Sequence, residues 1–162
     1  MKKIRQGVFE TNSSSTHSLS LRSSRDYENF SIPEEISFGE FGWGYDVLKS
    51  PEEKLSYVLT FIGHLERFYD IKDLKSANSK FEEVKYIKWL KEVVKEKTGE
   101  SFDIVLIDSE YYPFGYIDHQ SLEPSIFEEE GFWSEDGVEF KNKMKDLIFN
   151  EKYSIIIDND NH

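Results

Sequence analysis

The sequence contains no cysteine among its 162 residues. This absence excludes disulfide bonds, zinc sites built on thiolates, iron–sulfur clusters and thiol nucleophiles. Long apolar runs are also missing, because no window approaches the roughly eighteen apolar residues of a membrane-spanning helix and no apolar stretch of signal-peptide length follows the first residues. We therefore expect a soluble, cytoplasmic protein that has no membrane partner.

Basic residues are scarce relative to acidic ones. The chain has 20 Lys and Arg against 32 Asp and Glu, and its formal net charge is −12. Residues 98–140 include no Lys or Arg, and this segment contains Glu128, Glu129 and Glu130. Such a run repels polyanions, so we expect no direct binding of nucleic acid. The run is either a solvated surface or a face that docks on a basic partner protein.

Apolar material is sufficient for one core, because aromatic residues make up 15% of the chain. The length is typical of one domain, so we predict a single domain over residues 1–162. Regular alternation of strands and helices is missing, which favours an α+β fold with a mixed β-sheet packed against about three helices. Strand patterns lie in residues 4–9, 17–22, 35–46, 101–108, 111–118 and 153–160, and the segments 101–108 and 111–118 are predicted to be neighbours.

Three segments have the apolar spacing of helices. The first begins with Ser50 as N-cap, Pro51 at the first helical position and Glu53 completing a capping box, and its apolar face extends to Tyr69. The second is predicted to run from near Ser79 to Gly99, and the third occupies residues 137–150.

The segment ETNSSSTHSLSL, residues 10–21, combines an acid, an amide, several hydroxyls and an imidazole just before a predicted strand. One interpretation is a turn stabilised by hydrogen bonds from Ser and Thr side chains to the backbone. The other is a loop whose hydroxyl and amide groups surround the oxygens of a small anion. The loop lacks the glycines and lysine of a P-loop. The candidate ligand-binding residues are Asn12, Ser13, Ser14, Ser15 and Arg22.

A second polar segment, GYIDHQS at residues 115–121, follows a predicted strand. His119 could act as a general base or a metal ligand, with Asp118 as a ligand or proton-transfer partner, although adjacent strand residues face opposite sides. The alternative is an ordinary surface histidine. If His119 and His17 meet in space, they form with Glu10 or Asp118 a plausible acid/base or metal site.

Three other segments favour structural roles. His64 lies in the first predicted helix with no second histidine one turn away, so we predict that it packs rather than binds metal. The glycines of residues 39–44 lack the order of a dinucleotide fingerprint and predict a bulged strand. Asp158 and Asp160 follow the last strand, where a solvated tail is favoured over a cation site.

The segment GVFETNSSSTHSLSL, residues 7–21, resembles the N-terminal signature F-E-T-N-S-S-S-x-H-S of a group of uncharacterised phage and prophage proteins of Gram-positive bacteria. GEFGW at residues 39–43 and YIDHQS at residues 116–121 are similar to motifs that recur in that group. The resemblance covers under a fifth of the chain and implies a phage origin and a bacterial host cell, but no reaction. The matching positions are Glu10, Asn12, Ser13, Ser14, Ser15, His17, Asp118 and His119.

Two functions are compatible with these patterns. In the first, the two histidine motifs converge on a pocket for a phosphorylated or nucleotide-like ligand, with His17, His119, Asp118 and Glu10 as catalytic candidates if the ligand is processed. In the second, the protein is an acidic accessory factor that binds and inhibits a host protein, such as a defence component, through Glu128–Glu130. The sequence leaves open whether the protein is an enzyme and whether it needs a metal or another cofactor.

Overall fold

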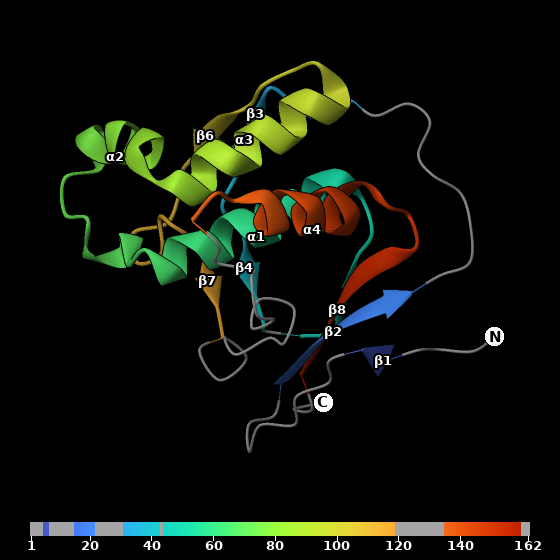
Figure 1. The fold of residues 1–162 in the computed structure, drawn as a ribbon. Helices are drawn as coiled ribbons and strands as arrows, with labels where there is room; N and C mark the ends of the chain where they lie inside the picture. The colour runs from blue at the N-terminus through green and yellow to red at the C-terminus, as the bar shows by residue number, and fades with distance from the viewer. Residues whose placement is uncertain (1–4, 7–14, 22–30, 43, 119–134, 160–162) are drawn as a thin grey trace.

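The structure is a computed structural model, and it describes residues 5–6, 15–21, 31–42, 44–118 and 135–159. Within these ranges helices and strands follow one another without βαβ repetition, which confirms the α+β class (Figure 1). Among the described helices, none combines the length and the apolar character needed to cross a bilayer.

Segments from both ends of the described chain and from its middle form a four-stranded antiparallel sheet. Its order is β1-β2-β8-β5, with β1 at Arg5–Gln6, β2 at Ser15–Leu21, β8 at Tyr153–Asn159 and β5 at Asp46–Leu48. The strand predicted over residues 17–22 is therefore present as β2, and it pairs along its full length with β8. The buried Ile155 and Ile157 of β8 supply apolar side chains at the centre of this sheet.

Two further pairs of short strands are parallel. β3 (Glu35–Ser37) pairs with β6 (Asp103–Val105), and β4 (Glu40–Phe41) pairs with β7 (Tyr116–Ile117). The single strand predicted over residues 35–46 is thus divided into β3, β4 and β5. The predicted neighbours in residues 101–108 and 111–118 are not paired with each other, because each has its partner in the 35–41 segment instead.

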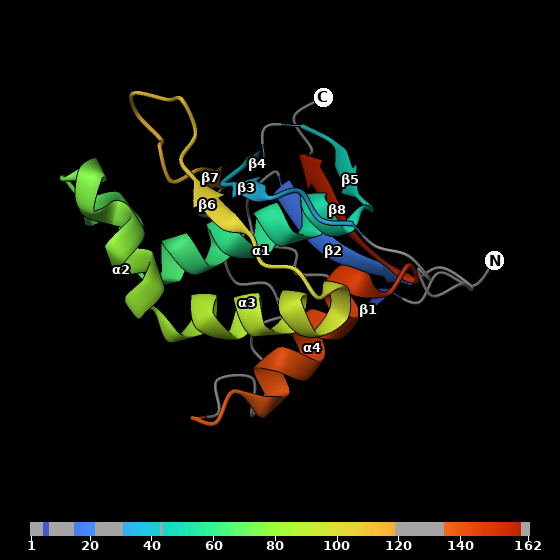
Figure 2. The same cartoon turned by 90° about the horizontal axis from the view of Figure 1, so that it is seen from above.

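The first helix, α1 (Pro51–Leu65), begins as its sequence predicts. The Ser50 side chain accepts the N–H of Glu53 at 3.2 Å, and the Glu53 carboxylate accepts the N–H of Ser50 at 2.9 Å. Figure 2 shows α1 between the strands and the other helices, and residues on all of its sides are buried. The helix ends earlier than predicted, because Arg67 adopts a left-handed conformation and Tyr69 lies in the short 3₁₀ helix η1 (Phe68–Asp70).

The second predicted helix is two helices. After the 3₁₀ turn η2 (Leu74–Ser76), α2 covers Ala77–Glu83 and α3 covers Lys85–Thr98, and Val84 between them is extended, with ψ 118°. This break turns α2 so that Phe81 packs against Phe38 and Phe68. Gly99 ends α3 in the predicted left-handed conformation.

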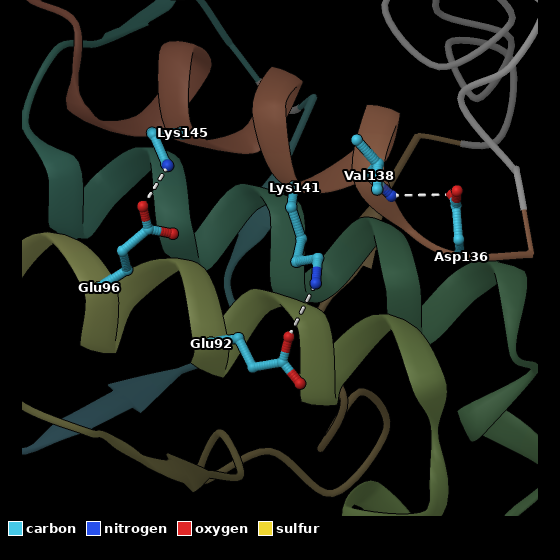
Figure 3. A network of polar contacts seen from close by, with 6 residues as sticks. All are labelled: Glu92, Glu96, Asp136, Val138, Lys141 and Lys145. Carbon is cyan, nitrogen blue, oxygen red and sulfur yellow. Dashed lines mark hydrogen bonds and ion pairs between the residues drawn. The ribbon is translucent and has the colours of Figure 1, made fainter.

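The last helix, α4 (Val138–Phe149), confirms the helix predicted over residues 137–150 and packs against α3. Two ion pairs join the helices, Lys141 to Glu92 at 3.0 Å and Lys145 to Glu96 at 2.6 Å (Figure 3). At the start of α4, the side chain of Asp136 accepts the N–H of Val138 at 3.1 Å. Exposed pairs of this kind contribute at most about 1 kcal/mol each, so the buried apolar side chains of α3 and α4 carry most of the packing energy.

One charged side chain is buried beside the four-stranded sheet. Lys54 in α1 is fully buried, and its Nζ donates to the carbonyl oxygens of Asn150 at 3.3 Å and Tyr153 at 3.0 Å. These bonds tie the turn between α4 and β8 to the first turns of α1. Burial lowers the pKa of Lys54 to about 8, and the charge of Glu151 offsets only part of that effect.

We expect the free energy of unfolding to increase with pH, and we attribute this increase to the deprotonation of Lys54. Its folded-state pKa of about 8 lies below its usual value of 10.5, so between these values the unfolded chain binds more protons and higher pH favours the folded state. The gain from pH 7 to pH 9.5 is about 2 kcal/mol. Urea denaturation of the wild type and Lys54→Met at both pH values measures it, and equal pH responses of the two proteins would contradict the assignment.

Candidate functional site

The structure describes only part of the two predicted site segments. Ser15 is the first residue of β2, His17 lies in the same strand, and Asp118 directly follows β7. The other sequence-predicted residues lie outside the described residues: Glu10, Asn12, Ser13, Ser14, Arg22, His119, Glu128, Glu129 and Glu130.

The segments 39–43 and 116–121 meet in the β4–β7 pair. Tyr116 pairs with Glu40 in register, and the N–H of Asp118 donates to the carbonyl of Phe41 at 3.1 Å. A Cβ built on Gly42 would lie 2.7 Å from the Cβ of Asp118, so the missing side chain allows the two chains to approach this closely. Two of the three motifs that the sequence singles out are therefore in direct contact.

The third motif lies in the four-stranded sheet that also contains β5, which follows β4 in the chain. His17 lies opposite Ile157 of β8, and Asp46 of β5 lies opposite the same residue. Asp46 follows Gly42 by four residues in the sequence. We use the name motif junction for the described motif residues Gly42, Asp118, Ser15 and His17 together with Asp46.

Arg5 of β1 does not belong to the Ser15 end of the four-stranded sheet. Arg5 pairs with Ser20, near the opposite end of β2. Ser15 and Leu21, the residue before Arg22, are the two ends of a seven-residue strand, which separates them by about 20 Å. A small ligand that touches Ser15 therefore lies a full strand length from Leu21.

Beside β7 lies a hollow of about 450 Å³ that we call the aromatic cleft. Its walls come from the end of α1, from η1 and from the segment that leads into β7. The residues that define it here are His64, Leu65, Tyr69, Tyr112, Phe114 and Tyr116. Tyr69 and Tyr112 are 60% and 45% exposed, so large parts of their side chains face solvent.

The rings of the aromatic cleft form a continuous row. The ring centroid of His64 lies 6.2 Å from that of Tyr69 and 6.2 Å from that of Tyr116, and Tyr116 lies 5.3 Å from Tyr112. These separations are those of interacting aromatic pairs, which hold one another in place. The row therefore presents several ring surfaces in a fixed arrangement.

His64 connects the aromatic cleft to the motif junction. Its Nε2 accepts the backbone N–H of Ile117 at 3.2 Å, so this nitrogen carries no proton and the proton of the neutral ring is on Nδ1. The bond ties the last turn of α1 to β7, one residue before Asp118. The sequence predicted a packing role for this histidine, and its partners could not be read from the helix pattern.

The surroundings of the aromatic cleft carry more acids than bases. Glu66 and Asp70 follow two of its lining residues directly, and Glu110 precedes Tyr112 by two positions; all three are exposed. Arg67 pairs with Asp70 at 3.0 Å, and its guanidinium lies 5.8 Å from the ring centroid of Tyr69. Exposed charges of both signs therefore adjoin the residues that line the aromatic cleft.

A second hollow of about 470 Å³ lies between β3, β5 and the start of α1. Its lining includes the carboxylates of Glu35, Asp46, Glu52 and Glu53. Within the described ranges, no group of three or more His, Asp or Glu residues is arranged to hold a metal ion.

Comparisons with known proteins identify no relative. No protein-family model matches the chain, and neither the curated proteins nor the solved structures give a match.

Proposed function

We propose that this protein binds a small nucleotide-like ligand at the motif junction, as an accessory protein of a phage or prophage. The observation that carries the proposal is the contact of Gly42 with Asp118 in the β4–β7 pair. This contact joins two of the three motifs. In the four-stranded sheet, His17 of the third motif and Asp46 of β5 both lie opposite Ile157 of β8. The contact of Gly42 with Asp118 supports the proposal because it brings together polar segments that are distant in the sequence.

The proposed roles follow from the chemistry of each side chain. Hydroxyl and amide groups of Asn12, Ser13, Ser14 and Ser15 donate hydrogen bonds to phosphate oxygens. His17 and His119 supply the groups that transfer protons near neutral pH, with Glu10 and Asp118 as their carboxylate partners. Arg22 lies outside the described residues, so its part in ligand binding stays a prediction.

The alternative, inhibition of a host protein through Glu128–Glu130, rests on residues outside the described ranges. The described residues offer no observation that favours this alternative over ligand binding. If a ligand binds the motif junction, the proposed function does not require Glu128–Glu130 to bind a partner.

A thermal-shift experiment tests the proposal. Nucleoside 5′-monophosphates and cyclic nucleotides at about 100 times Kd should raise the Tm of the wild type by about 5–10 °C, because a ligand that binds only the folded state stabilises it by about 2.7 kcal/mol. The His17→Ala/His119→Ala double variant should show less than half of that shift. Ser15→Ala should also weaken binding, and Ser20→Ala, in the same strand and near its opposite end, is its matched control.

The proposal is wrong if the wild type is folded and none of these nucleotides shifts its Tm. It is also wrong if the double variant and the Ser15→Ala variant respond as the wild type does. In that case Glu128→Lys/Glu129→Lys/Glu130→Lys and a host pull-down test the alternative directly.

A further inference from the structure

We infer that the aromatic cleft binds a planar heterocycle and that this ring is the base of the nucleotide-like ligand. The second part of this inference rests on the proposed function. The volume of about 450 Å³ lies within the range of small-molecule pockets, roughly 300–1,000 Å³. It is large enough to enclose a base together with part of a sugar.

Stacking is the interaction that this cleft offers. Four rings in a row, those of Tyr69, His64, Tyr116 and Tyr112, line one hollow, and neighbouring rings are tilted or edge-on to each other. The exposed parts of Tyr69 and Tyr112 are apolar surface that a stacked ring would remove from water. Every nucleobase has such a face, so stacking of this kind tolerates different bases.

The residues that line the aromatic cleft are mostly uncharged, so the uncharged base is the part of the ligand that fits there. The exposed Glu66, Asp70 and Glu110 adjoin lining residues in the sequence, and Asp70 is paired with Arg67. Tyr116 lines the cleft and Asp118 belongs to the motif junction, two residues further along the same chain. Two residues of extended chain span about 7 Å, and their side chains share one side. A base stacked on Tyr116 therefore directs its sugar toward the motif junction.

A cation of the protein itself already lies at one ring of the cleft. Aromatic rows can attract ammonium groups through cation–π interactions. Here the guanidinium of Arg67 already lies 5.8 Å from the ring centroid of Tyr69, and a second cation at that ring would be repelled. A neutral, planar ring meets no such repulsion.

Isothermal titration tests the inference with defined probes. The four ribonucleosides, their 5′-monophosphates and ribose 5-phosphate are titrated into the wild type and into Tyr69→Leu/Tyr112→Leu. Leucine keeps apolar volume but removes the π surface, so nucleoside affinity should fall at least tenfold, since stacking on one aromatic side chain contributes about 1–3 kcal/mol per base. Tyr111→Leu is the matched control, because Tyr111 is 79% exposed and does not line the cleft.

The outcomes separate this inference from the proposed function. Loss of nucleoside binding in the cleft variant, with the Tyr111→Leu control unchanged, supports the inference. Nucleotide binding that survives in the cleft variant but is lost in His17→Ala/His119→Ala overturns the inference and leaves the proposed function intact. A third outcome is that nucleosides bind as tightly as nucleotides and that His17→Ala/His119→Ala leaves both affinities unchanged. This outcome supports base binding in the aromatic cleft and overturns the proposed function. If no nucleoside binds the folded wild type, the inference is wrong, and ribose 5-phosphate tests the motif junction separately.

Discussion

Phe38→Ala is expected to lower the free energy of unfolding by about 3–5 kcal/mol, the usual cost of truncating a buried phenylalanine. Phe38 is 1% exposed, and its ring contacts three other rings, with centroid distances of 6.2 Å to Phe68, 5.6 Å to Phe81 and 5.9 Å to Phe114. The variant loses buried apolar area and leaves a cavity among side chains from η1, α2 and the segment before β7. Urea denaturation followed by far-UV circular dichroism measures the loss.

The matched control for this prediction is Phe38→Leu. Leucine fills most of the same volume, so its cost should stay below about 1.5 kcal/mol. If Phe38→Ala costs less than about 1 kcal/mol, the ring cluster is not the part of the core that holds α2 and the cleft-forming segment in place.

Gly115→Ala is expected to lower the free energy of unfolding by about 3 kcal/mol or more and to weaken ligand binding. Gly115 has φ +71°, and a left-handed conformation costs an alanine about 1 kcal/mol. A Cβ at this position would also lie 2.3 Å from the carbonyl oxygen of Gly39 and 2.9 Å from Cγ2 of Thr60. Because Gly39 O accepts the N–H of Tyr116 at 2.9 Å, relieving the clash separates β4 from β7.

Gly99→Ala is the control that measures the cost of a left-handed alanine without the steric clash expected at position 115. Gly99 has nearly the same backbone angle, φ +75°, but a Cβ there would meet no atom within 4 Å. We expect this variant to lose only about 1 kcal/mol and to bind ligand as the wild type does. Equal losses in the two variants, measured by urea denaturation, would mean that the close approach of Gly115 to Gly39 does not hold the β4–β7 pair together.

Local signals predicted the start of α1 and the end of α3, because such signals act within one turn of chain. The capping box of Ser50 and Glu53 satisfies backbone groups three residues apart, and Gly99 ends its helix through its own backbone angle. The break at Val84 was not predictable from the same pattern. It depends on Phe81 packing into a ring cluster whose other members come from distant segments.

Strand partners depended on contacts that the sequence does not display. Residues 101–108 and 111–118 are adjacent in the chain, and sequential strands often pair, so we predicted them as neighbours. Each pairs instead with part of the 35–41 segment, and this choice brings Gly42 to Asp118. The aromatic cleft escaped prediction for the same reason, because its rings come from α1, η1 and the approach to β7.

The measurement that tests the central claim most directly is a set of intermolecular nuclear Overhauser effects between a bound nucleoside 5′-monophosphate and the tyrosine rings. The account predicts contacts from base protons to the rings of Tyr69, Tyr112 and Tyr116, and contacts from sugar protons to Asp118. Base contacts confined to other residues at saturating ligand would contradict the account, as would a saturated complex in which these three rings show no contact to the base.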